Sequence, residues 1–134
     1  TNNGTQYSEQ LNKLNVPGQI NLGNGATGHE PKDVALDQVI NSNLAGAFRE
    51  NIAKYIVMIT DAAPSGLDDD YTAADEGRVA VLGQNCIEYG IKVFILGPGA
   101  GLPVWQKLAT DTGGAYDTSF DPTTISTVIE NACA

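Results

Sequence analysis

Hydrophobic positions in the second half of the chain fall into continuous runs and spaced stripes. Tyr55–Ile59 is a continuous apolar run rich in β-branched residues, and Ile91–Leu96 is a second run of this kind. Runs of this length that end in polar loops are typical of strands buried on both faces. Ala115–Asp117 is predicted to form a third, shorter strand.

Apolar residues before the first run recur at helical spacing. Pro31 is predicted to begin a helix, as proline does at the first helical position. Leu36, Val39 and Ile40 form the apolar stripe of this helix. Residues 41–50 are predicted to be a polar continuation or a second short helix.

Three further helices are predicted after the strands. The helix over Tyr71–Tyr89 ends at Gly90, because a glycine just after a helix commonly stops it. The next helix begins near Pro103, and Asp121 with Pro122 provides an N-cap and a first-turn proline for the last one. The apolar residues assigned to these helices are Ala73, Ala80, Val81 and Ile87, then Trp105, Leu108 and Ala109, then Ile125, Val128, Ile129 and Ala132.

Helices and strands therefore alternate along the chain. Such alternation predicts parallel strands joined by right-handed helical crossovers, in a three-layer, doubly wound α/β sheet. Ligands of these sheets bind at the carboxyl ends of the strands, so the loops 60–70 and 97–101 are candidate binding loops. The first 22 residues are polar and irregular, and residues 23–134 carry the regular pattern.

The charge of the chain narrows the classes of partner. Seven basic and sixteen acidic residues give a formal net charge of −9, whereas nucleic acids and anionic membranes are bound by clustered Lys and Arg. We therefore expect neither a nucleic acid nor an anionic membrane as a partner. The acidic charge is compatible with binding a metal cation or a basic partner, or it serves solubility alone. No apolar run approaches the roughly 20 residues of a membrane-spanning helix, so no membrane insertion is expected.

Few residues suit catalysis or a structural metal. His29 is the single histidine and has no nucleophile motif beside it, so we do not expect an enzyme. Cys86 and Cys133 lack the spacing of a zinc site and form either reduced core thiols or a disulfide. Asn3 begins an N-glycosylation triplet, and the acidic run 68–70 is expected to be solvated.

Four segments resemble the von Willebrand factor type A domain family. They are YIVMITDAAPSG at 55–66, YGIKVFILGPG at 89–99, LATDTGGAY at 108–116 and GATGHEPKDVAL at 25–36. Their order and spacing are similar to the C-terminal two-thirds of such a domain, over residues 23–134. The resemblance implies a protein-binding, adhesion or scaffolding module of an extracellular or cell-surface protein.

The resemblance also implies a site for Mg²⁺ or another divalent cation, completed by a carboxylate of a protein partner. Asp61 matches the ligand after the central strand, and Thr27 matches the ligand from the second loop, with Glu30 as the alternative. The family's Asp-x-Ser-x-Ser motif is absent from the sequence, and its strand would precede Thr1. We therefore expect a sheet that is incomplete at the N-terminus and that associates with another chain or a missing N-terminal segment.

We predict a Cys86–Cys133 disulfide that would tie two predicted crossover helices together. A bridge to a cysteine in the missing N-terminal segment is equally consistent with the resemblance. Two other functions stay open. The absent motif favours a purely structural subunit of an extracellular assembly with no working metal site. The glycines of 97–101 are followed by Asp117, twenty residues after Gly97. This pattern resembles a dinucleotide-binding fingerprint and favours a nucleotide-binding enzyme fragment. Against this, the third glycine comes one residue early, and Pro98 removes a backbone donor.

Overall fold

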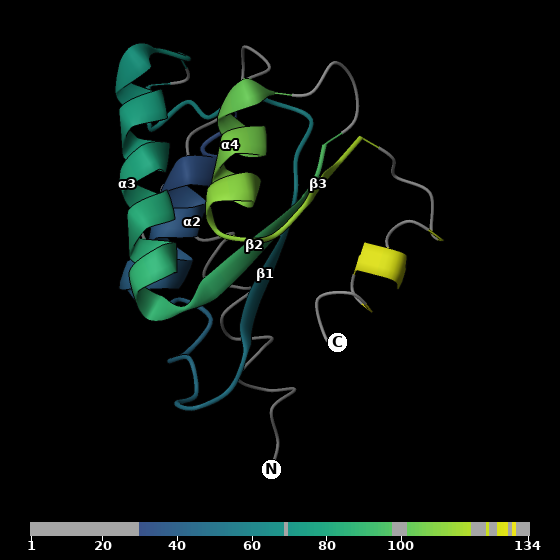
Figure 1. Cartoon of the computed structure of the whole chain (residues 1–134). Coiled ribbons are helices and arrows are strands. Elements are labelled where there is room, and N and C mark those ends of the chain that lie inside the picture. The colour runs from purple at the N-terminus through teal and green to yellow at the C-terminus, as the bar shows by residue number, and fades with distance from the viewer. Residues whose placement is uncertain are drawn as a thin grey trace.

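The computed structural model of the chain describes residues 30–68, 70–97, 102–118, 123, 126–128 and 130. Within these residues helices and strands alternate as predicted (Figure 1). None of the described helices is long and apolar enough to cross a membrane. Residues 123, 126–128 and 130 are helical, in the region of the expected last helix. The elements are α2 (Lys32–Asn41), β1 (Lys54–Ile59), α3 (Ala73–Tyr89), β2 (Ile91–Leu96), α4 (Pro103–Asp111) and β3 (Tyr116–Asp117).

Local sequence signals fix both ends of α3. The Oγ1 atom of Thr72 accepts a hydrogen bond from the amide of Ala74 at 3.2 Å, and the Oδ2 atom of Asp75 accepts one from the amide of Thr72 at 2.8 Å. This reciprocal capping satisfies amides that the first turn leaves unpaired. Gly90 ends the helix in the left-handed conformation, with φ of 68°, which favours glycine. The predicted glycine stop is confirmed.

The described strands form a parallel sheet in the order β1-β2-β3. β1 and β2 pair along their full length, so that Ile56 lies opposite Val93 and Met58 opposite Ile95. β3 pairs with the last two residues of β2. Parallel neighbours need a crossover connection, which α3 and α4 provide. The predicted α/β class with a parallel sheet is therefore confirmed for the described residues.

The core lies between one face of this sheet and the helices α2, α3 and α4. Successive side chains of a strand point to opposite faces, so Ile56 and Met58 share a face with Ile91, Val93 and Ile95. Met58, Ile91, Val93 and Ile95 belong to one buried cluster that also includes residues of all three helices. Ile56 is partly buried and packs against this cluster. The helical members are Leu36 and Ile40, then Val79, Leu82 and Cys86, then Trp105, Leu108 and Ala109.

The apolar residues that the sequence analysis assigned to α3 do not form its buried face. Ala73, Ala80, Val81 and Ile87 are all exposed. The helix instead buries Val79, Leu82, Gly83 and Cys86 among its apolar and small residues. α3 carries apolar residues on more than one side, so helical spacing alone did not determine which side meets the sheet. The expected inward residues of α4 are confirmed, and residues 42–53 form turns and bends rather than a second helix.

The opposite face of β1 is only partly covered. Tyr55, Val57 and Ile59 point to this face, and Val57 and Ile59 are 40% and 52% exposed. The prediction that this strand is buried on both faces is therefore wrong, whereas β2 does bury Phe94 and Leu96 on the same face. Because α2, α3 and α4 all pack on the other face, the three-layer, doubly wound arrangement stays a prediction.

Candidate functional site

β1 and β2 end at the same edge of the sheet. Asp61 follows β1 at this edge, separated from the strand by Thr60. The amide of Thr60 donates to the carbonyl oxygen of Leu96 at 3.0 Å, and the amide of Gly97 donates to the carbonyl oxygen of Asp117 at 2.8 Å. The hydrogen-bonded ladder therefore continues to the residue before Asp61. This carboxyl edge is where parallel α/β sheets bind ligands.

The first part of the loop after β1, residues 60–66, is buried except at one residue. Thr60 and residues 62–66 are buried, whereas Asp61 between them is exposed. The amide of Ala62 donates to Thr60 Oγ1 at 3.2 Å, and the indole Nε1 of Trp105 donates to the carbonyl oxygen of Ala62 at 2.9 Å. Asp61 forms no hydrogen bond or ion pair with another described residue. A fixed backbone thus presents this carboxylate to solvent.

The segment before α2 runs beside this loop. The amide of Glu30 donates to the carbonyl oxygen of Ala63 at 3.1 Å, and Glu30 forms a parallel bridge with Pro64. Glu30, the alternative to Thr27 as the second cation ligand, therefore lies next to the loop of Asp61. The carboxylate of Glu30 lies 3.1 Å from the ammonium of Lys32, so this alternative ligand already has a cationic neighbour. Thr27 lies outside the described residues and stays a prediction.

A partly buried charged cluster joins the loop to two helices. Asp33 of α2 is fully buried, and its carboxylate forms an ion pair with the guanidinium of Arg78 in α3. The Nη1 atom of Arg78 also lies 2.9 Å from Oδ1 of Asp75. The amide of Gly66, at the end of the loop, donates to Oδ1 of Asp33 at 3.2 Å. One cluster therefore contacts α2, α3 and the loop.

Both partners of the ion pair within α3 have shifted pKa values. The hydrogen bond to Asp33 raises the pKa of Arg78 above its ordinary value, and this effect outweighs the opposite effect of burial. Burial acts to raise the pKa of Asp75, but hydrogen bonds from Thr72 and Arg78 lower it more. The net pKa of Asp75 therefore lies below its ordinary value, and the cluster favours the charged forms of both groups.

Sequence reasoning did not single out Asp33, Asp75 or Arg78. Thr72 and Asp75 have the spacing of a capping box, so this part of the cluster had a local signal that could have been found. Asp33 and Arg78 are 45 positions apart, and no spacing rule links them. Their contact depends on how α2 packs against α3.

Asp61 fits one oxygen ligand of a divalent cation. Its carboxylate is accessible at the carboxyl edge, and carboxylate oxygens are preferred ligands of Mg²⁺. Within the described ranges, no three His, Cys, Asp or Glu side chains converge to hold a metal ion. Asp68 and Asp70 are exposed, as expected for a solvated acidic run. The described residues therefore supply one position of a cation site, and the other ligands would come from elsewhere.

Gly97 has a packing role at this edge. A Cβ atom at position 97 would meet the hydroxyl of Tyr116 and lie 3.2 Å from the carbonyl oxygen of Thr60. Tyr116 donates to the carbonyl oxygen of Gly97 and accepts a hydrogen bond from the amide of Leu102, both at 3.2 Å. The Gly97 amide is bonded within the sheet and is not available to a phosphate. Packing explains this glycine without a nucleotide, and residues 98–101 lie outside the described ranges.

The predicted disulfide and glycosylation sites are described only in part. Cys86 is fully buried in α3, and burial raises the pKa of its thiol, in the reduced form, to about 11. Cys133 and Asn3 lie outside the described residues. Both the Cys86–Cys133 bridge and the glycan at Asn3 therefore stay predictions.

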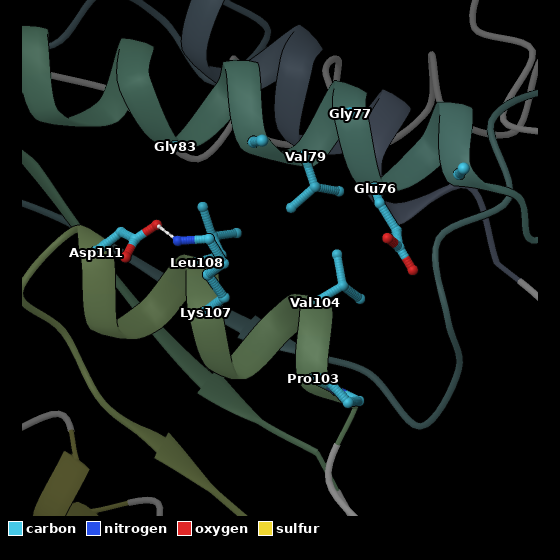
Figure 2. Close-up of a pocket in the computed structure, with 11 residues that line it drawn as sticks. Glu76, Gly77, Val79, Gly83, Pro103, Val104, Lys107, Leu108 and Asp111 are labelled. Atoms are coloured by element: carbon cyan, nitrogen blue, oxygen red, sulfur yellow. Dashed lines mark hydrogen bonds and ion pairs between the residues drawn. The ribbon is translucent and has the colours of Figure 1, made fainter.

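A groove of about 420 Å³ lies between α3 and α4 (Figure 2). Val104 and Leu108 of α4 line its apolar part, and Figure 2 shows Glu76 and Asp111 toward opposite ends. The Asp111 carboxylate pairs with the ammonium of Lys107 at 2.6 Å, and Glu76 accepts a hydrogen bond from the Tyr71 hydroxyl at 2.6 Å. Since Glu76, Lys107 and Asp111 each already have a hydrogen-bond or ion-pair partner, none of these three groups is free to orient a ligand.

Comparison with known proteins does not identify a family. The chain matches no protein-family model, no curated protein and no solved structure. The resemblance to von Willebrand factor type A domains therefore rests on the sequence segments alone and remains a prediction.

Proposed function

We propose that this chain is a non-enzymatic binding or scaffolding module of an extracellular or cell-surface protein, and that it binds a protein partner through a divalent cation. Asp61 would supply one carboxylate ligand to Mg²⁺ or a similar ion, and an acidic side chain of the partner would supply another. Protein sites for Mg²⁺ commonly use one or two carboxylates and several waters, so a single carboxylate from this loop suits the ion.

The observation that carries the proposal is the exposure of Asp61 between two buried stretches of the loop, Thr60 and residues 62–66. An Asp that only stabilised its own turn would accept hydrogen bonds from nearby backbone amides. Asp61 accepts none from the described residues, whereas the Ala62 amide is bound by Thr60 and the Gly66 amide by Asp33. Other side chains satisfy these amides, so the Asp61 carboxylate is available to an external ligand.

The outer edge of β1 supports association with another polypeptide segment. The amide of Thr60 bonds to β2, so Met58 also directs its backbone groups to β2, while Tyr55, Val57 and Ile59 direct theirs to the opposite edge. No described strand pairs with that edge, and proteins normally pair or cover such edges. We infer that a strand from another chain or an N-terminal segment pairs here and brings further cation ligands.

Thermal unfolding of the full chain with and without Mg²⁺ tests the proposal. Asp61→Asn is compared with Glu88→Gln, because each removes one exposed carboxylate and Glu88 lies near the amino end of β2. A ligand that binds only the native state raises the free energy of unfolding by about 2.7 kcal/mol at roughly 100 times its Kd. Wild type and Glu88→Gln are expected to gain thermal stability, and Asp61→Asn is expected to gain none.

Two results of this titration would contradict the proposal. An equal gain in Asp61→Asn would place the cation elsewhere. No gain in wild type would favour a purely structural subunit, which the absence of an Asp-x-Ser-x-Ser motif also supports. A parallel titration with a dinucleotide separates the third function, because only a nucleotide-binding fragment would be stabilised by it.

A further inference from the structure

The outer edge of β1 is a continuous row of backbone groups. Tyr55, Val57 and Ile59 direct their amides and carbonyls to this edge, because the residues between them direct theirs to β2. In the part of the chain that the structure describes, the sheet has no strand beyond β1. Edges of this kind are templates for pairing with another chain.

β1 lacks the features that commonly keep edge strands from pairing. Proteins protect such edges with proline, bulges or charged side chains. The strand reads KYIVMI, without proline, and it pairs with β2 without a bulge. Its one charged residue is Lys54 at the first position, whose ammonium donates to the carbonyl oxygen of Tyr89 at 2.9 Å. The middle of the edge is therefore uncharged and unprotected.

The open face beside this edge is apolar. Val57 and Ile59 are exposed, and Tyr55 is half-buried beside Phe94, with ring centroids 6.1 Å apart. Phe94 and Leu96 of β2 are buried on the same face. The exposed apolar part of the face therefore lies over β1, where it joins the outer edge. A strand added to this edge would place its own side chains beside Val57 and Ile59.

The edge is complementary to itself when two copies meet in antiparallel orientation. If Val57 lies on a two-fold axis, it faces Val57 of the second copy, and Tyr55 faces Ile59 of the second copy. All three residues then direct backbone groups to one another as hydrogen-bonded pairs. Aromatic and β-branched side chains that lie opposite each other stabilise a sheet. This register therefore pairs each apolar residue that β1 presents on its open face.

Local charge favours the same arrangement. Lys54 lies at the amino end of β1, and Asp61 follows its carboxyl end. Antiparallel pairing brings the carboxyl end of each strand beside the amino end of the other, so an acidic and a basic residue lie at each end of the pair. This complementarity offsets part of the repulsion between two chains that each carry a net charge of −9.

We propose that, when no other partner is bound, a second copy of this chain pairs with the outer edge of β1 and forms a two-fold dimer with one continuous sheet. This inference goes beyond the cation-dependent function and does not rest on it. An edge accepts one strand at a time, so the second copy and a strand of another partner compete for the same place.

Sedimentation velocity of the full chain without divalent cations tests the inference. Wild type is expected to sediment with twice the mass of one chain. Val57→Pro removes an outward amide and no bond to β2, a position where edge strands tolerate proline, and Val57→Lys places like charges opposite each other. Each is expected to raise the dissociation constant of the dimer about tenfold or more. The control Val81→Lys changes an exposed residue of α3 and should leave the constant unchanged.

Cysteine cross-linking tests the register. The two-fold axis places position 57 opposite itself with Cα atoms about 5.5 Å apart, within the range that a disulfide spans. Val57→Cys is therefore expected to form a covalent dimer on oxidation, which reduction separates. Ile59→Cys lies opposite Tyr55 of the second copy and should form none. Wild type under the same oxidant controls for Cys86 and Cys133.

Three results would overturn the inference. A monomeric wild type would indicate that the edge is covered within the chain or pairs only with a different partner, and the cation-dependent function would be unaffected. A dimer that persists in Val57→Lys would have its contact elsewhere, and this variant decides the outcome if circular dichroism shows that Val57→Pro does not fold. Equal cross-linking of Val57→Cys and Ile59→Cys would exclude the two-fold register.

Discussion

The indole nitrogen of Trp105 donates a hydrogen bond to the carbonyl oxygen of Ala62, and the two atoms are 2.9 Å apart. Trp105 is fully buried in α4, whereas Ala62 lies in the loop after β1, 43 positions earlier. Buried tryptophans usually find a partner for the indole N–H. In this protein the partner is the loop that presents Asp61, so one side chain both fills the core and holds the candidate site.

Trp105→Phe is expected to lower the free energy of unfolding by about 1–3 kcal/mol. The variant keeps an aromatic ring in the core, but it removes the indole donor and leaves unfilled volume. Urea unfolding followed by circular dichroism measures the loss. Val81→Ala is the control, since Val81 is 60% exposed and its truncation should change stability by less than about 0.5 kcal/mol. Equal stability of the two variants would contradict the anchoring role of Trp105.

Two glycine substitutions are expected to act in opposite directions. A Cβ atom at Gly114 would overlap the backbone carbonyl of Val93, which cannot move without disturbing β2, so Gly114→Ala should destabilise the fold by about 1–3 kcal/mol. Gly77 lies inside α3 with nothing within 4 Å of such an atom. Gly77→Ala should therefore stabilise the fold by about 0.5–1 kcal/mol. Paired thermal melts decide the signs, and a stabilising Gly114→Ala would contradict the packing at β2.

Asp75 is expected to make the fold sensitive to acid. Its pKa in the folded state lies below the ordinary value of 3.8, so its stabilising contribution is fully present above about pH 4 and is lost as the pH falls through the folded pKa. Asp75→Asn should be less stable than wild type at neutral pH, and the difference should shrink on acidification. Unfolding by urea at several pH values measures this. A constant difference would show that the Asp75 charge does not contribute.

The Cys86–Cys133 bridge predicts a specific change in mass. The intact chain should gain about two hydrogen atoms on reduction, because one S–S bond opens to two thiols. An unchanged mass would mean that Cys86 is a reduced core thiol. Alkylation of Cys86 should then require unfolding, because this residue is fully buried. A second polypeptide released on reduction would instead indicate a bridge to another chain.

Much of the candidate site follows from local patterns, and the rest does not. The position of Asp61 was predictable, because a polar residue that closely follows a parallel strand lies at the carboxyl edge of the sheet. The capping of α3 by Thr72 and Asp75 also has a local signal. The ion pair of Asp33 with Arg78 has none, since it depends on the packing of two helices.

The sequence by itself determined where the described helices and strands lie and how the strands run, though not that residues 42–53 lack a helix. Apolar runs, caps and the stop at Gly90 act over a few neighbouring residues. Only the tertiary structure decided which side of α3 is buried, because this helix carries large apolar residues both on the buried side, Val79 and Leu82, and on exposed sides, Val81 and Ile87. It also decided that Asp61 is exposed while residues 62–66 are buried. Burial depends on contacts between segments far apart in the chain, and no local pattern encodes those contacts.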